Sequence, residues 1–154
     1  MKIQKQKIVL IEDDAALGNS ILELLHLNNF EVTWFDDSTQ ALVYLTQNIP
    51  DLIISDLMMP KMNGGELFFQ IRKNKKFTTV PYIIITANVD DETKLRQLEL
   101  GVNDYIMKPF KVKELIFKVN NVLELRKNIE KNFGIDPFSK VTIKLSEKDF
   151  LTSL

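Results

Sequence analysis

Five residues able to do chemistry stand at the ends of short apolar runs in this sequence. Glu12 closes KIVLIE and Asp13 follows it, Asp56 follows DLIIS, Thr86 closes PYIIIT, and Lys108 follows DYIM. A carboxylate beside a buried strand is costly unless a cation or hydrogen bonds compensate its charge. The acidic residues are therefore either turn formers and helix caps at the surface, or members of one site with a cationic partner.

If the apolar runs lie side by side, the carboxylates cluster, and they repel one another and raise one another's pKa unless a cation neutralises them. One shared site that binds a cation is then favoured. Oxygen ligands select a hard cation, and Mg²⁺ uses few carboxylates and shares phosphate oxygens. An aspartate can also attack phosphorus to give an acyl phosphate, which needs mainly positioning and charge neutralisation. Asp56 is the candidate acceptor, Lys108 the positive charge and Thr86 a hydroxyl donor. Taken alone, Lys108 is better explained as a solvated lysine, but Pro109 and Phe110 follow it at a strand end and favour a place in the site.

Alternating apolar runs and helical patterns are expected to position these residues. The runs cover 7–12, 31–35, 51–55, 81–86 and 104–107, and the helical patterns cover about 17–28, 38–47, 64–74, 91–100 and 112–132. Ser38 is expected to cap the second helix and Gly64 to open the third. Parallel strands need crossover connections, and strands buried on both faces are continuously apolar. We therefore expect an α/β fold with a parallel sheet, and ligands beyond the carboxyl ends of its strands.

The composition argues against several other classes of protein. The 154 residues are 45% hydrophobic and 27% charged with a net charge of −1, so a globular chain without direct nucleic-acid binding is expected. The absence of cysteine excludes disulfides and thiolate metal sites. No apolar run approaches the roughly 18 to 20 residues of a membrane span, and no signal peptide precedes the first run. A cytoplasmic protein with no membrane contact is expected.

Four motifs, IVLIEDD, DLIISDLMMPKMNG, IIITA and DYIMKPF, occur in this order along the chain. They resemble the receiver domain of two-component response regulators, over about residues 5–130. The resemblance implies a flavodoxin-like (βα)5 fold, doubly wound, with a five-stranded parallel sheet in the order 2-1-3-4-5. It also implies a receiver domain over 1–130, followed over 131–154 by a linker and the start of a further, absent domain.

The resemblance assigns a role to each position of the site. Asp56 matches the phospho-acceptor, and Glu12, Asp13, Asp56 and the Met58 backbone carbonyl match the Mg²⁺ ligands. Met58 and Asn88 match two variable positions that tune phosphoryl lifetime in the family, and apolar Met58 suggests a lifetime longer than seconds. Glu12 stands where many members have aspartate, a variant expected to leave metal binding intact.

Further roles follow from the later motifs of the same resemblance. Thr86 and Lys108 match residues that contact the phosphoryl group, and the peptide bond before Pro109 is expected to be cis. Tyr105 matches an aromatic switch residue that moves inward together with the threonine; a half-buried tyrosine with its hydroxyl in water is the alternative. His26, the only histidine, is expected to be an exposed bystander.

Outside the motifs, Asp14 is expected to cap the first helix. Apolar residues of the last helical pattern continue beyond the usual end of a receiver domain. Residues at alternating spacings of four and three form one stripe along this helix, namely Leu115, Val119, Val122, Arg126, Ile129 and Phe133. Its first part is expected to face the core, and its extension either begins a two-stranded coiled coil or packs on its own domain. The later segment SEKDFL resembles hybrid sensor histidine kinases that carry an AraC-like output domain.

The predicted function is a switch that takes a phosphoryl group from a histidine kinase and relays it to an output domain or partner, with transcription regulation as the expected outcome. A homodimer is a further possibility, through the face of 91–100, 104–107 and 112–132. There Glu114 and Lys118 pair either across the dimer or within the helix. A phosphorylation-independent interaction domain is the alternative function. A phosphatase is disfavoured because Met58 stands where such enzymes have a second aspartate. A nucleotide-binding module is disfavoured because no phosphate-binding glycine motif follows the first strand.

Overall fold

A five-stranded parallel sheet forms the centre of the protein in a computed structural model, which describes residues 4–59, 61–87 and 101–133. The strand order is β2-β1-β3-β4-β5, as the family resemblance implied. The strands are β1 (Lys7–Ile11), β2 (Glu31–Phe35), β3 (Leu52–Asp56), β4 (Tyr82–Thr86) and β5 (Asp104–Met107). The predicted strands therefore agree with the observed ones to within a residue or so at each end.

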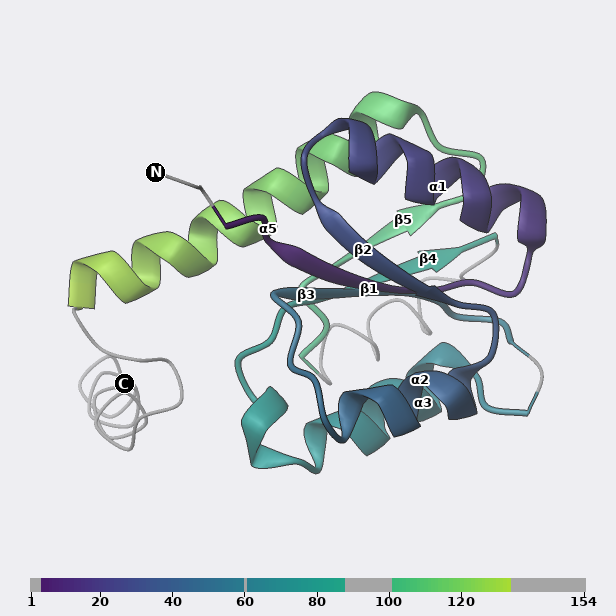
Figure 1. Ribbon diagram of the computed structural model, residues 1–154, viewed down its shortest axis with the longest axis horizontal. Coiled ribbons are helices and arrows are strands. Elements are labelled where there is room, and N and C mark those ends of the chain that lie inside the picture. The colour runs from purple at the N-terminus through teal and green to yellow at the C-terminus, as the bar shows by residue number, and fades with distance from the viewer. Residues whose placement is uncertain (1–3, 60, 88–100, 134–154) are drawn as a thin grey trace, which may run out of the picture.

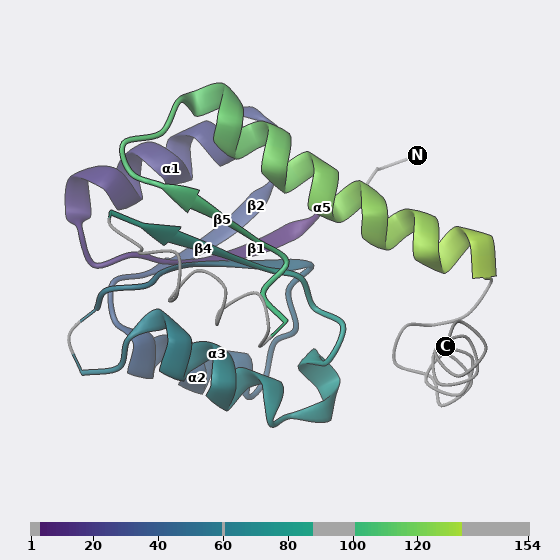
Figure 2. The same cartoon turned by 180° about the vertical axis from the view of Figure 1, so that it is seen from behind.

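Helices cover both faces of this sheet (Figure 1). They are α1 (Ala15–Leu27), α2 (Ser38–Leu45), α3 (Gly64–Arg72), a short 3₁₀ turn η1 (Lys75–Phe77) and α5 (Val112–Phe133). Helices α1 and α5 lie on one face, and α2 and α3 lie on the other, as the view from behind also shows (Figure 2). The helix expected over 91–100 and the segment 134–154 lie outside the described residues.

Two hydrophobic layers hold these helices on the sheet. Successive strand residues point to opposite faces, so Ile8 and Leu10 pack toward α1 and α5, while Val9 and Ile11 pack toward α2 and α3. Strands β3 and β4 are buried over their whole length, which is the reason their sequences are continuously apolar. Each such side chain contributes about 1.5–3 kcal/mol when it is fully buried. The sheet is therefore a rigid support for whatever lies at its edge.

Acidic residues cap the two helices that follow β1 and β2. Asp14 accepts a hydrogen bond from the Leu17 N–H at 3.0 Å, which confirms its predicted role as the cap of α1. The prediction for α2 was wrong by one residue, because Asp37 is its cap and accepts from the Thr39 N–H at 2.7 Å. Ser38 is instead the first helical residue. Its buried hydroxyl donates to the Met62 carbonyl at 2.9 Å, so it is unavailable as a cap.

The last helix, α5, lies along the sheet with its first half and extends past the sheet with its second half (Figures 1 and 2). Leu115, Val119 and Val122 belong to the core, as predicted. Arg126 then donates to the Asp51 carbonyl at 3.0 Å, whereas Ile129 is 42% exposed. The pairing of this extension with another chain stays a prediction. No helix in the described ranges is both long enough and apolar enough to cross a membrane.

Candidate functional site

The carboxyl ends of four strands bring the predicted site residues to one edge of the sheet. Strand β1 pairs with β3 so that Ile11 lies opposite Ser55, and β3 pairs with β4 so that Asp56 lies opposite Ile85. Strand β4 pairs with β5 so that Thr86 lies opposite Met107. The residues that end or follow these strands are Glu12, Asp13, Asp56, Thr86 and Lys108. Parallel pairing in register therefore gathers side chains that are up to 96 positions apart in the sequence.

Three carboxylates form the centre of this site. One carboxylate oxygen from each of Glu12, Asp13 and Asp56 lies within 4.8 Å of the other two. Glu12 and Asp56 are buried, whereas Asp13 is exposed at the mouth. Three carboxylates so close together repel one another, so the cluster favours any cation that reaches it.

Lys108 supplies one positive charge to the cluster. Its Nζ lies 2.9 Å from Asp56 Oδ2 and 3.0 Å from Glu12 Oε1. Burial by itself would lower the pKa of Lys108, but its hydrogen bonds and charge interactions with Asp56 and Glu12 outweigh burial and raise this pKa. The lysine is therefore a fixed cation, and the peptide bond that joins it to Pro109 is cis, as predicted.

Glu12 shows the cost of burying a carboxylate in this place. Burial and a hydrogen bond with Asp56 raise its pKa to about 7, although Lys108 and the Asp14 N–H act in the opposite direction. The Asp14 N–H donates to Glu12 Oε2 at 3.2 Å. Near neutral pH the cluster is therefore close to taking up a proton in place of a cation.

Thr86 is fully buried at the end of β4, and its hydroxyl has no hydrogen-bond partner among the described residues. A buried hydroxyl without a partner loses about 1–3 kcal/mol relative to a satisfied one. Such a group is suited to donate to an oxygen that arrives from outside the protein. The structure places Thr86 one residue beyond the register partner of Asp56, as the strand-end pattern predicted.

Asp56 is held by the chain that follows it. The Met58 N–H donates to Asp56 Oδ1 at 3.1 Å, and the Met58 side chain is 69% exposed. Gly64 lies beneath this turn, where a Cβ atom would come within 2.4 Å of the Asp56 carbonyl oxygen. The sequence placed Gly64 at the start of α3, but its close approach to the Asp56 backbone was missed.

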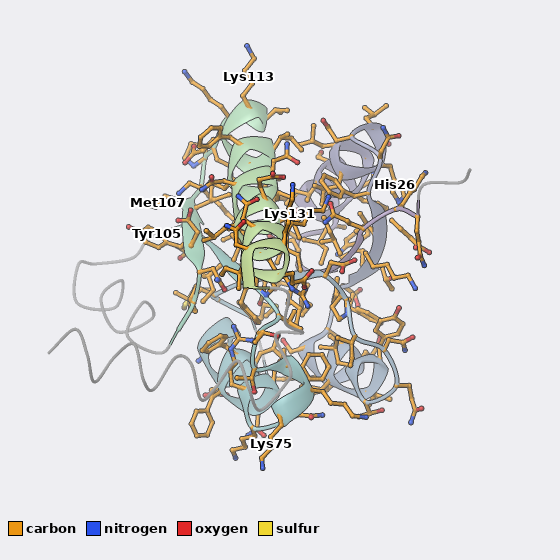
Figure 3. The ribbon with its side chains drawn as sticks, turned by 90° about the vertical axis from the view of Figure 1, so that its left-hand side faces the viewer. His26, Lys75, Tyr105, Met107, Lys113 and Lys131 are labelled. Carbon is orange, nitrogen blue, oxygen red and sulfur yellow. The ribbon has the colours of Figure 1, made fainter. Side chains whose placement is uncertain are left out.

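The switch candidate Tyr105 lies on edge strand β5 and is half buried. It packs at the margin of the α2–α3 layer, and Figure 3 shows its side chain pointing away from α5. The Lys118 ammonium lies 5.7 Å from its ring centroid and donates to the Tyr105 carbonyl at 3.0 Å. Lys118 also pairs with Asp104 at 2.9 Å, so within the chain it contacts β5 rather than Glu114, and their pairing across a dimer stays a prediction.

Two other residues complete the comparison with the sequence. His26 is exposed on α1, as expected for a bystander (Figure 3). Trp34, which the sequence placed only in a strand, donates its indole N–H to the Glu12 carbonyl at 2.9 Å. Nothing in the local sequence around Trp34 indicates this contact, because it joins residues that are 22 positions apart.

Known proteins are similar to this chain over most of its length. The family model described as response regulator receiver domain matches residues 8–120 of this chain. Hybrid signal transduction histidine kinase D of Dictyostelium discoideum is 34% identical over 148 residues, which are 93% of this chain and 9% of that protein. DNA-binding response regulator MtrA of Mycobacterium bovis is 38% identical over 128 residues, which are 83% of this chain and 54% of that protein. The chain therefore spans about half of one such relative and a small part of the other.

Solved structures agree in both fold and sequence. The non-phosphorylated HemR receiver domain of Leptospira biflexa is 34% identical, with a TM-score of 0.72 over 77% of this chain and 94% of that one. A receiver domain of a Pseudomonas aeruginosa sensor histidine kinase, with a magnesium ion coordinated in its active site cleft, is 30% identical. Its TM-score is 0.72 over 79% of this chain and 99% of that one. The chain belongs to the response regulator receiver domain family of two-component phosphorelays.

Proposed function

We propose that Asp56 accepts a phosphoryl group from a histidine kinase and that the chain acts as a phosphorylation-dependent switch. The observation that carries this proposal is the Asp56 carboxylate at the end of β3, with the Lys108 ammonium 2.9 Å away and two further carboxylates beside it. The acceptor is thus fixed by the sheet, the Lys108 ammonium offsets part of the negative charge around it, and the carboxylates beside it can hold a cation that offsets the rest. Phosphoryl transfer needs mainly these two conditions.

The transfer step assigns a task to each residue. A carboxylate oxygen of Asp56 attacks phosphorus, the P–N bond of the phosphohistidine breaks, and the imidazole nitrogen leaves with the bonding electron pair. Lys108 remains beside Asp56 and offsets charge on the phosphoryl oxygens. The Thr86 hydroxyl, which has no partner among the described residues, donates to one of these oxygens.

The residues present fit a divalent cation. Three carboxylates face one ammonium, so the fully ionised cluster has a formal charge of −2. Oxygen ligands of this kind, few in number and open on one side, suit Mg²⁺. Glu12, Asp13, Asp56 and the Met58 backbone carbonyl would hold it, and when bound it would neutralise charge on the phosphoryl oxygens.

The acyl phosphate carries about −2 charge where the carboxylate carried −1, and this change is the signal. Thr86 and Tyr105 form the proposed bistable element, because they lie on adjacent strands β4 and β5. Lys118 links β5 to α5 through Asp104 and the Tyr105 carbonyl, so movement of Tyr105 would reach α5. A homodimer through this face remains part of the proposal.

The partners and output are proposed on the basis of relatives. The kinase donor follows from the family, and transcription regulation is suggested by relatives such as Transcriptional regulatory protein BaeR of Escherichia coli, 33% identical over 117 residues. In this proposal DNA binding belongs to another domain of the protein, because the described chain has no basic surplus. The division into a receiver over 1–130 and a linker over 131–154 stays a prediction.

Intact-mass measurement after incubation with Mg²⁺ and acetyl phosphate tests the acceptor. Wild type should gain about 80 Da, the mass of one phosphoryl unit, and Asp56→Asn should gain nothing. Asp36→Asn is the matched control, because Asp36 is an exposed aspartate at the end of β2. An adduct on Asp56→Asn would refute the assignment. No adduct on any variant would favour the interaction-domain alternative, and continuous release of phosphate over many turnovers would favour a phosphatase.

A further inference from the structure

Trp34, the only tryptophan of the chain, contacts the backbone of the acidic cluster. Its indole N–H donates to the Glu12 carbonyl at 2.9 Å, and the Glu12 N–H donates to the Phe35 carbonyl at 3.0 Å. The end of β2 therefore holds Glu12 from both sides of the residue. The carbonyl in question belongs to the peptide unit that joins Glu12 to Asp13.

Gly18 in α1 makes room for this indole. A Cβ atom at Gly18 would lie 2.2 Å from Trp34 Cζ2 and 2.8 Å from its Nε1, distances that real side chains do not adopt. Glycine inside a helix is less stable than alanine by about 1 kcal/mol, so its presence there needs a packing reason. The indole ring is that reason, since the ring that donates to the Glu12 carbonyl occupies the space that a Cβ atom at position 18 would take.

Asp13 follows the Glu12 carbonyl that Trp34 binds, and its other neighbour, Asp14, is also held in place. Asp14 caps α1 by accepting from the Leu17 N–H at 3.0 Å, and its own N–H donates to Glu12 Oε2 at 3.2 Å. Exposed Asp13 thus lies between a peptide unit held by Trp34 and a residue held by α1. Its carboxylate position depends on these neighbours.

We propose that Trp34 is a positioning residue, which fixes the Glu12–Asp13 peptide so that the acidic cluster is arranged for a divalent cation, and that Gly18 permits this contact. The inference rests on the proposed function, because it concerns the same cation site. Residues that do not touch the metal but hydrogen-bond to its ligands commonly influence metal affinity, because they orient those ligands. Since Trp34 is the only tryptophan, its fluorescence also reports directly on the site.

Titration calorimetry with Mg²⁺ tests the proposal on the Trp34→Phe variant, which keeps an aromatic ring but loses the N–H donor. We expect the dissociation constant for Mg²⁺ to rise about 3- to 10-fold, as follows from the loss of one hydrogen bond that orders a ligand. Val32→Ala is the matched control, because Val32 lies on the same strand and packs in the same layer as Trp34. It should lower the unfolding temperature but leave the Mg²⁺ affinity unchanged.

Fluorescence of the wild-type protein provides a second measurement that needs no folded variant at position 34. Trp34 emission should change on addition of Mg²⁺, with a midpoint equal to the calorimetric dissociation constant, and this change should vanish in Asp13→Asn. Gly18→Ala should weaken Mg²⁺ binding as Trp34→Phe does, and the double variant should be no weaker than either single variant. Such non-additivity is expected when both changes break one contact.

The outcomes separate this inference from the proposed function. If wild type and Trp34→Phe bind Mg²⁺ with the same affinity, the role of Trp34 is overturned, but the cation site is not. The same holds if wild type binds Mg²⁺ with no change in Trp34 emission. Equal weakening by Val32→Ala and Trp34→Phe also overturns it, because the effect would then reflect stability rather than positioning. Wild type that fails to bind Mg²⁺ overturns the cation site and this inference together.

Discussion

In the absence of Mg²⁺, removal of the Lys108 charge should destabilise the folded protein. It should also increase the stabilisation that Mg²⁺ provides. In Lys108→Met the side chain keeps its length, but buried Glu12 and Asp56 lose the ammonium that lies 3.0 and 2.9 Å from them. Breaking a fully buried ion pair costs about 3–5 kcal/mol. Because the Lys108 side chain is 21% exposed, solvent screens part of this, and we expect a loss of about 1–3 kcal/mol.

The loss should also depend on pH and on the cation. Lys108 lowers the pKa of Glu12, so in Lys108→Met this pKa lies above its wild-type value of about 7. Protonation of Glu12 at low pH diminishes the repulsion in the variant, so the deficit should be larger at pH 8 than at pH 6. Mg²⁺ should stabilise Lys108→Met more than wild type, because it binds the folded state and meets one positive charge fewer. Urea unfolding with a chelator and then with excess Mg²⁺, at pH 6 and at pH 8, measures both effects.

Lys61→Met is the matched control for this experiment. Its ammonium pairs with Asp37 at 3.2 Å, but its side chain is 69% exposed, so no comparable loss is expected. Equal stability of Lys108→Met and wild type in the chelator would refute the argument. So would an equal gain from Mg²⁺ in both proteins, because the lysine and the cation would then not compete for the same negative charge.

Three other perturbations test separate parts of the structure. Gly64→Ala should lower the free energy of unfolding in urea by more than about 2 kcal/mol, because the added Cβ would lie 2.4 Å from the backbone oxygen of Asp56. It should also reduce the yield of the acetyl phosphate adduct. Wild-type stability of this variant would contradict the prediction. Since the pKa of Glu12 is raised from 4.5 to about 7, its contribution to stability is complete below pH 4.5 and is lost as pH rises through 7. Mg²⁺ must displace that proton, so its calorimetric affinity should strengthen between pH 5.5 and pH 7.5 and this dependence should be absent in Glu12→Gln. Asp14→Ala removes the cap of α1 and should cost about 0.5–2 kcal/mol in thermal unfolding, whereas Asn19→Ala, an exposed change inside α1, should not destabilise.

The sheet and the gathering of the site could be predicted because both depend on patterns that are local in the sequence. A strand buried on two faces must be continuously apolar, as β3 and β4 are, so its ends are visible without knowledge of its neighbours. Parallel strands present their carboxyl ends at one edge, which places Asp56 and Lys108 together once the strands are known.

Contacts between elements were not predictable in the same way. Asp37 and Ser38 are adjacent and both suit a helix cap, and only the Met62 carbonyl decides that Ser38 is engaged elsewhere. Lys118 has a possible partner one turn away on its own helix. It pairs instead with Asp104, because α5 packs against β5 and brings that carboxylate within 2.9 Å.

The sequence by itself determined the residue types of the site, their order and the edge of the sheet to which they belong. Only the tertiary structure decided how they are charged and held. Burial raises the pKa of Glu12, Lys108 lies between Glu12 and Asp56, and Trp34 reaches the Glu12 carbonyl across the space that Gly18 leaves open. Each of these depends on solvent exclusion and on short distances between distant segments, which come into existence only when the elements pack.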